Sequence, residues 1–428
     1  MTAFGRLCAG AAALALGVGG QVASAKTTII HADHVVVDPQ SPVRGQSTVI
    51  VTDGKIVSIA DGFTDGPAGA DMVHLAGKTL VAGLVDLHVH LNGDPSGDWW
   101  REATDTDEWG TVVAAKNARV TAKAGFTTVR DAGGNIRTML AVNDGIARGW
   151  IAGPRIIPAG SALSTIGGHG DVHGFRPEVM EALKGENTCT GAAECAAVVR
   201  ANVRDGSQWI KFHATGGVLS QGDKSLGQAF TDEEMKGIIG TAHELGVEAM
   251  SHAHADAGIL AAVRAGVDTI EHGTFTSPAT AKEMKARGTV LVPTLLAFKG
   301  IGEKLGTGFY TPAVEDKIRM TLDHIGEGCR NARAAGVTVA FGTDSGVTDH
   351  GRNAEEFALL ADKCGMTARQ ALATATTTAA KVLHMESQIG RLAPGYSADI
   401  IAVSGDPTQD ARVLEKVEWV MSQGRVVE

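Results

Sequence analysis

The chain has 428 residues, of which 44% are hydrophobic and 20% are charged, and its formal net charge at pH 7 is -10. This length fits one large α/β barrel with an appendage, and the composition is typical of a globular protein. The acidic balance argues against a nucleic-acid partner, because binding of phosphates requires a basic surface.

The first 25 residues differ from the rest of the chain. They contain one arginine followed by an apolar run up to about Val18, and they end in the sequence ASA. A basic residue, an apolar run and an Ala-x-Ala site in this order predict a cleavable signal peptide, and therefore a secreted or periplasmic protein. A buried alanine-rich helix is the alternative. The apolar run is too short for a membrane span, and no other segment reaches the required length.

Short strands are predicted at both ends of the mature chain. Residues 27–39 and 47–60 have this character, and Asp53-Gly54 between two apolar runs indicates a hairpin turn. The stretches 398–407 and 417–428 near the C-terminus have the same texture. We therefore expect one small β-sandwich domain that is built from both termini, residues 26–78 and 385–428.

From residue 79 the pattern changes to strands that alternate with amphipathic helices. One of these helices opens with the capping box Thr231-x-x-Glu234. Eight β/α units predict a (β/α)8 TIM barrel over residues 79–384, with an open doubly wound sheet as the main alternative. The eight strand candidates are residues 79–90, 126–133, 154–160, 208–217, 247–254, 267–273, 289–294 and 337–346.

Metal-binding and titratable residues lie at the carboxyl ends of several of these strands, where TIM barrels hold their catalytic groups. Side chains alternate along a strand, so two histidines separated by one residue share a face. A single histidine at a strand end is more often a hydrogen-bonded structural residue, but several such ends together predict a metal site. Imidazole and carboxylate ligands without thiolates suit Zn²⁺, with Mn²⁺, Fe²⁺ or Co²⁺ as alternatives. The residues are His88, His90, Lys211, His252, His254, His272 and Asp344.

Lys211 is unusual in this set, because an ammonium cannot bind a metal. Burial lowers the pKa of a lysine, and the neutral amine can capture CO₂ to give a carbamate, an anion that can bridge two metals. A buried lysine paired with a carboxylate is the alternative.

Four cysteines follow the predicted signal peptide: Cys189, Cys195, Cys329 and Cys364. Their spacing contains no CxxC pair, so they are poor candidates for metal ligands. Cys189 and Cys195 are close enough in the chain to form a small disulfide in an oxidising compartment, and two unrelated thiols are the alternative.

The motifs "GLVDLHVHL", "WIKFHATGGV", "HAHADAGI", "IEHGT", "GTDSG" and "GRLAPGYSADIIAV" occur in this order over nearly the whole mature chain. Together they resemble the amidohydrolase superfamily. Within it they resemble the imidazolonepropionase-like subgroup, which contains Xaa-Arg/Lys and Xaa-Pro dipeptidases and ochratoxin-cleaving amidases. Relatives of this kind are commonly homo-oligomers, which is our expectation for this chain.

The resemblance implies a site for two divalent metal ions, for which we expect zinc. By this resemblance His88 and His90 bind the more buried metal together with Asp344. Lys211, as N6-carboxylysine, bridges the two metals. The second metal is bound by His252 and His272, and His254 is an alternative ligand to His252.

The resemblance also implies hydrolysis of an amide bond in a dipeptide or an N-acyl amino acid. A hydroxide between the metals is the expected nucleophile, and Asp344 is expected to carry its proton to the leaving amine. His169, on a glycine-rich loop that also holds His173, is a candidate for substrate binding, as are His213 and His254. A turn histidine bonded to its own loop is the alternative for His169. The alternative functions are hydrolysis of a lactone, phosphotriester or cyclic imide, and a non-catalytic binding protein.

The predicted loop after the first barrel strand contains Trp99, Trp100 and Trp109 among six acidic residues and one basic residue. Such a loop can form an aromatic wall with an acidic lip that favours cationic or aromatic substrate side chains. A solvated surface is the alternative. An apolar leaving residue such as phenylalanine is therefore as well supported by the sequence as arginine or lysine.

Overall fold

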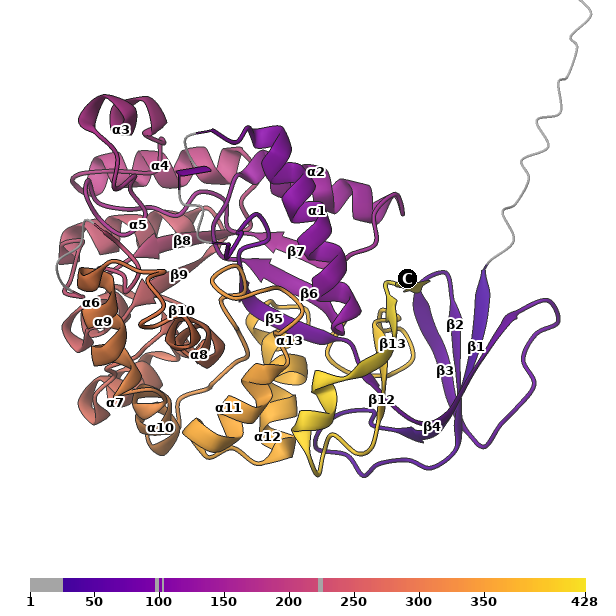
Figure 1. Cartoon of the computed structure of the whole chain (residues 1–428). Helices are drawn as coiled ribbons and strands as arrows, with labels where there is room; N and C mark the ends of the chain where they lie inside the picture. Colours follow the sequence, from indigo (N-terminus) through magenta and orange to yellow (C-terminus); the bar gives the residue numbers. More distant parts are fainter. Residues whose placement is uncertain (1–25, 97–99, 102–103, 222–225) are drawn as a thin grey trace, which may run out of the picture.

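The computed structural model describes residues 26–96, 100–101, 104–221 and 226–428, and the predicted signal peptide lies outside these residues. A sheet that both ends of the chain form lies beside a larger α/β part (Figure 1). The strands are β1 (Thr27–Val35), β2 (Ser47–Thr52), β3 (Lys55–Asp61), β4 (Asp71–Ala82), β5 (Leu84–Val89), β6 (Phe126–Asp131), β7 (Arg155–Pro158), β8 (Trp209–His213), β9 (Glu248–Ala253), β10 (Thr269–His272), β11 (Val290–Val292), β12 (Ile400–Ser404), β13 (Val417–Ser422) and β14 (Arg425–Val426).

The helices are mostly short and lie outside the parallel strands. Among those described, none combines the length and the apolar character that crossing a membrane requires. They are α1 (Asp107–Lys123), α2 (Ile136–Ala147), α3 (Pro177–Leu183), α4 (Ala192–Arg204), α5 (Asp232–Glu244), α6 (Asp256–Ala265), α7 (Pro278–Arg287), α8 (Leu295–Glu303), α9 (Pro312–Leu322), α10 (Glu327–Ala334), α11 (Glu355–Cys364), α12 (Ala368–Ala373) and α13 (Ala379–Val382), with a π-helix η2 (Thr374–Thr378) and a 3-10 helix η3 (Ala411–Glu415).

The two termini meet in one seven-stranded sheet with the order β14-β13-β12-β4-β1-β2-β3. β12, from the C-terminal part, pairs antiparallel with β4, from the N-terminal part, in the register Ile400 with Ala82 and Ser404 with Lys78. β4 also runs through the domain boundary that the sequence predicts after residue 78. The division of this sheet into two packed layers and the predicted domain boundaries stay predictions.

The hairpin between β2 and β3 is confirmed. Asp53 has φ 48° and Gly54 has φ 76°, so both central residues of the turn are left-handed, as a tight hairpin turn requires. On one side of this sheet, buried residues such as Ile30, Val49 and Leu80 form a hydrophobic core of their own. The hairpin thus holds the sheet in the register that buries its apolar face.

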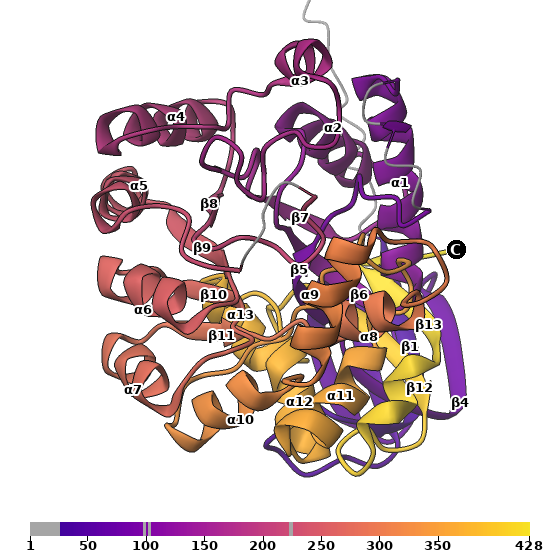
Figure 2. The ribbon, with the colours of Figure 1, turned by 60° about the vertical axis from the view of Figure 1, so that its left-hand side comes forward.

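The larger part is a mixed α/β fold of the TIM-barrel type. Its parallel strands form two sheets, with the orders β5-β6-β7 and β8-β9-β10-β11. Leu163, after β7, bridges to Phe212 in β8, so backbone contacts join the two sheets. Figure 2 shows α4, α5, α6, α7 and α10 following one another around the outside of these strands. This arrangement places the carboxyl ends of the strands around one common end of the fold.

Residues 337–346, which the sequence predicts as a strand, are not a regular strand. This segment contacts its neighbours by single bridges, Leu291 with Val339 and Val89 with Ser345. The ladder is irregular at Thr343, because its N–H donates to a carboxylate oxygen of Asp86 at 3.2 Å as well as to the His88 carbonyl at 3.4 Å, and that carbonyl also accepts from the Asp344 N–H at 2.7 Å. The segment still lies between β11 and β5, since the Leu87 N–H donates to the Phe341 carbonyl at 3.0 Å.

Two local features that the sequence indicates are present in the structure. The capping box of α5 is confirmed: the Thr231 hydroxyl accepts from the Glu234 N–H, and the Glu234 carboxylate accepts from the Thr231 N–H. The disulfide between Cys189 and Cys195 is present. A second disulfide, Cys329 to Cys364, joins α10 to the end of α11. This second pair was not predicted from the sequence. Its cysteines are separated by 35 positions, so closeness in the chain does not indicate that they pair.

Candidate metal centre

The first group of potential metal ligands consists of His88, His90 and Asp344. Their ligand atoms all lie within 4.8 Å of one another. The Nε2 atoms of His88 and His90 lie 3.4 Å and 3.2 Å from Asp344 Oδ1. β5 places the two histidines on one face, as the alternation of a strand requires. The sequence prediction that these three residues lie together is therefore correct in its geometry.

A buried hydrogen-bond network places Asp344 beside these histidines. Asp86 accepts hydrogen bonds from the backbone N–H of His88 and from the N–H and hydroxyl of Thr343, at 3.1, 3.2 and 2.6 Å. Asp344 follows with φ 58°, a left-handed conformation that a non-glycine residue adopts at an energetic cost. Burial raises the pKa of the Asp344 carboxyl, but His88 and His90 outweigh it and hold this pKa well below its usual range. Asp344 is therefore ionised at neutral pH.

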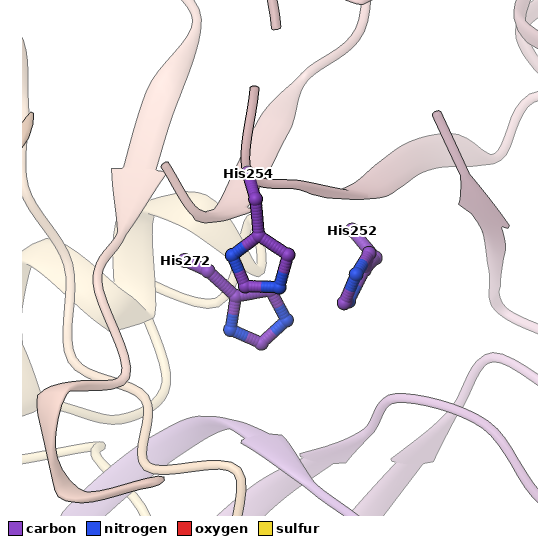
Figure 3. A group of neighbouring side chains, drawn as sticks. All are labelled: His252, His254 and His272. Atoms are coloured by element: carbon purple, nitrogen blue, oxygen red, sulfur yellow. The ribbon is translucent and has the colours of Figure 1, made fainter. Parts of the chain in front are cut away.

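The second group consists of His252, His254 and His272, from β9, the residue after β9, and the end of β10. Their ligand nitrogens also lie within 4.8 Å of one another. Figure 3 shows the rings of His254 and His272 lying over each other with His252 beside them, and the stacked pair has centroids 5.0 Å apart. The ring centroids of His88 and His272 are 5.2 Å apart, so the two groups are neighbours.

The ring nitrogens of these histidines are oriented by partners outside the site. The Nδ1 atoms lie within hydrogen-bond distance of protein oxygens, so the Nε2 atoms are left to face the site: His90 with Gly133 O at 2.9 Å, His254 with Thr274 Oγ1 at 2.8 Å and His272 with Thr294 Oγ1 at 2.6 Å. His252 is the exception, because its Nε2 lies 3.4 Å from Gly216 O and leaves Nδ1 for a ligand. Imidazoles that are oriented in this way, all of them buried except the partly buried His90, fit a divalent cation together with a carboxylate and no thiolate.

Lys211, in β8, lies against the first group. Its side chain is 2% exposed, and its Nζ lies 3.5 Å from His88 Nε2. Burial lowers the pKa of Lys211 to about 8, although Glu271 and Asp344 oppose this shift. A substantial fraction of the amine is therefore neutral in weakly alkaline solution, which is the form that reacts with CO₂.

The predicted substrate-binding histidines lie beside the second group. The ring of His169 has its centroid 4.3 Å from that of His252 and 4.9 Å from that of His213. His169 Nδ1 lies 2.5 Å from Ser220 Oγ, so its partner is outside its own loop. His173 differs, because its Nε2 lies 2.8 Å from Gly168 O in that loop. Burial lowers the pKa of His169 to about 3, so this imidazole is neutral at pH 7.

A cavity opens onto the second group and onto Asp344. Its remaining walls are mainly apolar and come from the segment after β8, from α8 and from the segment after Asp344. The predicted acidic loop lines a different cavity, in which Trp109 and Asp105 take part, and Trp99 lies outside the described residues. The residues that line the cavity are His169, Val218, Leu219, His252, His254, His272, Ala297, Phe298, Ile301, Asp344 and Val347.

Three buried charged residues next to the predicted ligands were not predicted from the sequence: Asp86, Arg130 and Glu271. All three are fully buried. The available signal was a charged residue inside an apolar strand, because such a residue is rarely buried without a partner.

The fold and the two ligand groups together define a metal-dependent enzyme of the TIM-barrel type. The chain belongs to the amidohydrolase family, whose model matches residues 79–427.

Curated relatives and solved structures agree with this assignment. The ochratoxinase of Aspergillus niger is 30% identical over 421 residues, which cover 92% of this chain and 85% of the relative. A Xaa-Pro dipeptidase with bound methionine in its active site has a TM-score of 0.87 and 34% identity, over 94% of this chain and 99% of that chain. A prolidase in complex with N-methylphosphonate-L-proline has a TM-score of 0.84 and 29% identity, over the same shares of the two chains.

These similarities confirm the superfamily that the sequence motifs predict. The chain is of the ochratoxinase and dipeptidase-like type and is a hydrolase of amide or peptide bonds. Its two groups of histidine and aspartate ligands agree with the use of divalent metal.

Proposed function

We propose that this enzyme uses two divalent metal ions to hydrolyse the amide bond of dipeptides or N-acyl amino acids. Zinc is the metal that we expect. The products are a free acid and a C-terminal amino acid with an apolar side chain. One observation carries the proposal. The two ligand groups lie next to each other, Lys211 contacts the first group, and a cavity with mainly apolar walls opens onto the second group and Asp344. The named activities of the relatives, an ochratoxinase, a Xaa-Pro dipeptidase and a prolidase, support amide substrates.

In this proposal His88, His90 and Asp344 hold one metal, and His252 and His272 hold the second. When bound, the metals lower the pKa of a water molecule and polarise the scissile carbonyl. Lys211 reacts with CO₂ as the neutral amine, forms an N–C bond and releases one proton. The side chain would change from a neutral amine to an anionic carbamate beside the two ligand groups.

Asp344 is the proposed proton carrier. It is ionised at neutral pH, and its carboxylate lines the substrate cavity as well as contacting the first ligand group. It can therefore accept the proton of the attacking water and donate it to the nitrogen of the leaving amine. His169 contacts the ring of His213 and lines the cavity together with His254. It is proposed to orient the substrate carbonyl or carboxylate as a neutral hydrogen-bonding group, with His213 and His254 as the further candidates.

The walls of the cavity favour an apolar leaving residue over arginine or lysine. Val218, Leu219, Phe298, Ile301 and Val347 present hydrocarbon surface, and the described lining contains no acidic side chain except Asp344. A cationic side chain would lose its hydration in this cavity without gaining a second carboxylate partner. Phenylalanine, methionine, leucine and proline are the side chains that this surface accommodates.

The wider organisation of the protein is also a proposal. We propose a closed eight-stranded barrel, a two-layered terminal domain, a signal peptide over residues 1–25 with export to the periplasm or beyond, and a homo-oligomer. The two disulfides support export, because disulfides persist in oxidising compartments. The resemblance to the subgroup supports the homo-oligomer.

A substrate panel tests the proposed reaction. Enzyme loaded with zinc in bicarbonate buffer is assayed with N-acetyl-Phe, N-acetyl-Met, Ala-Pro and N-acetyl-Arg, and with a lactone, a phosphotriester and a cyclic imide. We expect release of the apolar amino acids in preference to arginine, and release that is slower by about 10²-fold or more in the Asp344→Asn variant. Turnover of the lactone, phosphotriester or cyclic imide without turnover of any amide contradicts the proposal, and so does a preference for arginine.

A further inference from the structure

The buried carboxylate of Glu271 contacts His88 at Nδ1, the ring nitrogen that does not face Asp344. Glu271 Oε2 lies 2.7 Å from His88 Nδ1, on the side of the ring opposite to Asp344. The other carboxylate oxygen, Oε1, accepts from Arg130 Nη2 at 2.9 Å. The side chains of Glu271 and Arg130 are 0% exposed and that of His88 is 1% exposed, so the whole chain of contacts is buried.

This arrangement distinguishes His88 from the other histidines of the centre. The Nδ1 atoms of His90, His254 and His272 face a backbone carbonyl or a threonine hydroxyl, which are neutral groups. Only His88, among the histidines of the two ligand groups, has a carboxylate on Nδ1. A carboxylate partner fixes the tautomer of an imidazole and raises its basicity toward a metal more than a neutral partner does.

The end of β10 explains how Glu271 and His272 both reach this region. Neighbouring residues of a regular strand point to opposite faces. His272 has φ 70°, which ends the strand geometry and turns its side chain back toward the centre. Glu271 therefore contacts His88 from inside the barrel, while His272 lies with its ring 5.2 Å from that of His88.

Arg130 is held firmly in place by β6 and its neighbours. Its Nε donates to the carbonyl of Leu87, the residue before His88, at 2.7 Å. Its guanidinium lies over the ring of Trp209, 4.3 Å from the centroid. The Thr269 hydroxyl donates to the same Glu271 oxygen that Arg130 contacts, at 2.5 Å. Arg130 thus balances the charge of Glu271 and fixes both the backbone and the side chain at His88.

We propose that Glu271 and Arg130 are a positioning pair that presents His88 Nε2 to the metal and makes the His88, His90 and Asp344 site the tighter of the two metal sites. This inference rests on the proposed function in one respect, the use of two metals. Neither residue lines the substrate cavity, so we expect them to act on metal affinity through His88. Glu271 also acts on the nearby Lys211, and zinc affinity is therefore measured in CO₂-free buffer, in which Lys211 stays an unmodified amine.

The test measures zinc affinity of the metal-free enzyme by competition with a chromophoric chelator, and does not depend on activity. Glu271→Gln keeps the size of the side chain and removes its charge. We expect the tighter zinc site to weaken by about 10- to 100-fold, the usual effect of removing such a partner of a ligating histidine. Glu356→Gln is the matched control for the His88, His90 and Asp344 site, because Glu356 is equally buried but accepts from the Leu295 and Leu296 N–H groups and has no hydrogen bond to these three residues.

The double variant Arg130→Met/Glu271→Gln separates positioning from charge balance. Removing both members of a buried ion pair is usually better tolerated by the fold than removing one, so this variant keeps the test usable if Glu271→Gln fails to fold. We expect its zinc affinity to stay low. Affinity within about threefold of the unchanged enzyme in Glu271→Gln, or recovery of affinity in the double variant, overturns the inference. If the unchanged enzyme binds one zinc ion instead of two, the proposed function fails, while the effect of Glu271→Gln on that one site still decides the inference.

Discussion

Replacing Lys211 with methionine should make the metal-free protein more stable, and it should abolish the activity of the metal-loaded enzyme. The ammonium of Lys211 is buried, and burial lowers its pKa from the ordinary value of 10.5 to about 8. The unfolded chain therefore binds a proton at Lys211 that the folded chain binds less strongly. Methionine fills a similar volume and has no charge, so it removes this cost of folding.

The size of the effect follows from the pKa. Each unit of pKa corresponds to about 1.4 kcal/mol, so a fall from 10.5 to about 8 costs the folded state about 3 kcal/mol when the pH is below 8. The unfolded chain binds more protons than the folded chain between pH 8 and pH 10.5, and stability therefore rises with pH over this window. The advantage of the Lys211→Met variant should be about 3 kcal/mol at pH 7 and about 1 kcal/mol at pH 10.

The assay is urea unfolding of chelator-treated enzyme in CO₂-free buffer, which keeps the amine unmodified. Lys317→Met is the control, because the Lys317 ammonium is also buried but donates to the Gly217 and Ser220 carbonyls at 2.8 and 2.7 Å. We expect this control to lose stability at both pH values. A Lys211→Met enzyme that is less stable than the unchanged enzyme at pH 7, or an advantage that does not shrink at pH 10, refutes the reasoning.

Three further predictions concern catalysis, specificity and stability. Asp344→Asn should lower kcat by about 10²- to 10⁴-fold, the range expected for loss of a proton carrier; a smaller loss in a fully metal-loaded variant would exclude that role. Phe298→Ala should raise the KM for N-acetyl-Phe by about tenfold and change that for N-acetyl-Ala little, because it removes apolar wall; equal effects on both substrates would argue against this contact. Replacing Cys329 and Cys364 with alanine should cost about 4 kcal/mol in urea unfolding, against about 2 kcal/mol for the shorter loop of the other disulfide; equal costs would contradict the loop-length argument.

The site residues that can be predicted from the sequence belong to short patterns within single strands. His88 and His90, and likewise His252 and His254, are separated by one residue at the end of an apolar strand, and a strand puts such a pair on one face. The fold type followed from alternating strands and helices, and the hairpin and the capping box from their turn and cap residues. Local pattern was sufficient for all of these.

The residues that sequence analysis missed depend on contacts between distant strands. Glu271 meets His88 across 183 positions of sequence. The regular alternation of a strand also predicts that Glu271 and His272 point apart, and only the left-handed backbone at His272 changes this. The strand predicted to contain Asp344 is irregular for a similar reason, because the distant Asp86 carboxylate shares the Thr343 N–H with the His88 carbonyl.

Titration of metal-free enzyme with zinc in bicarbonate buffer, with hydrolysis of N-acetyl-Phe followed at each addition, tests the central claim most directly. We predict that activity rises to a break at two zinc ions per chain and that the Lys211→Met variant shows no such activity. Full activity at one zinc ion per chain or fewer, or hydrolysis that persists after complete removal of metal, would contradict it.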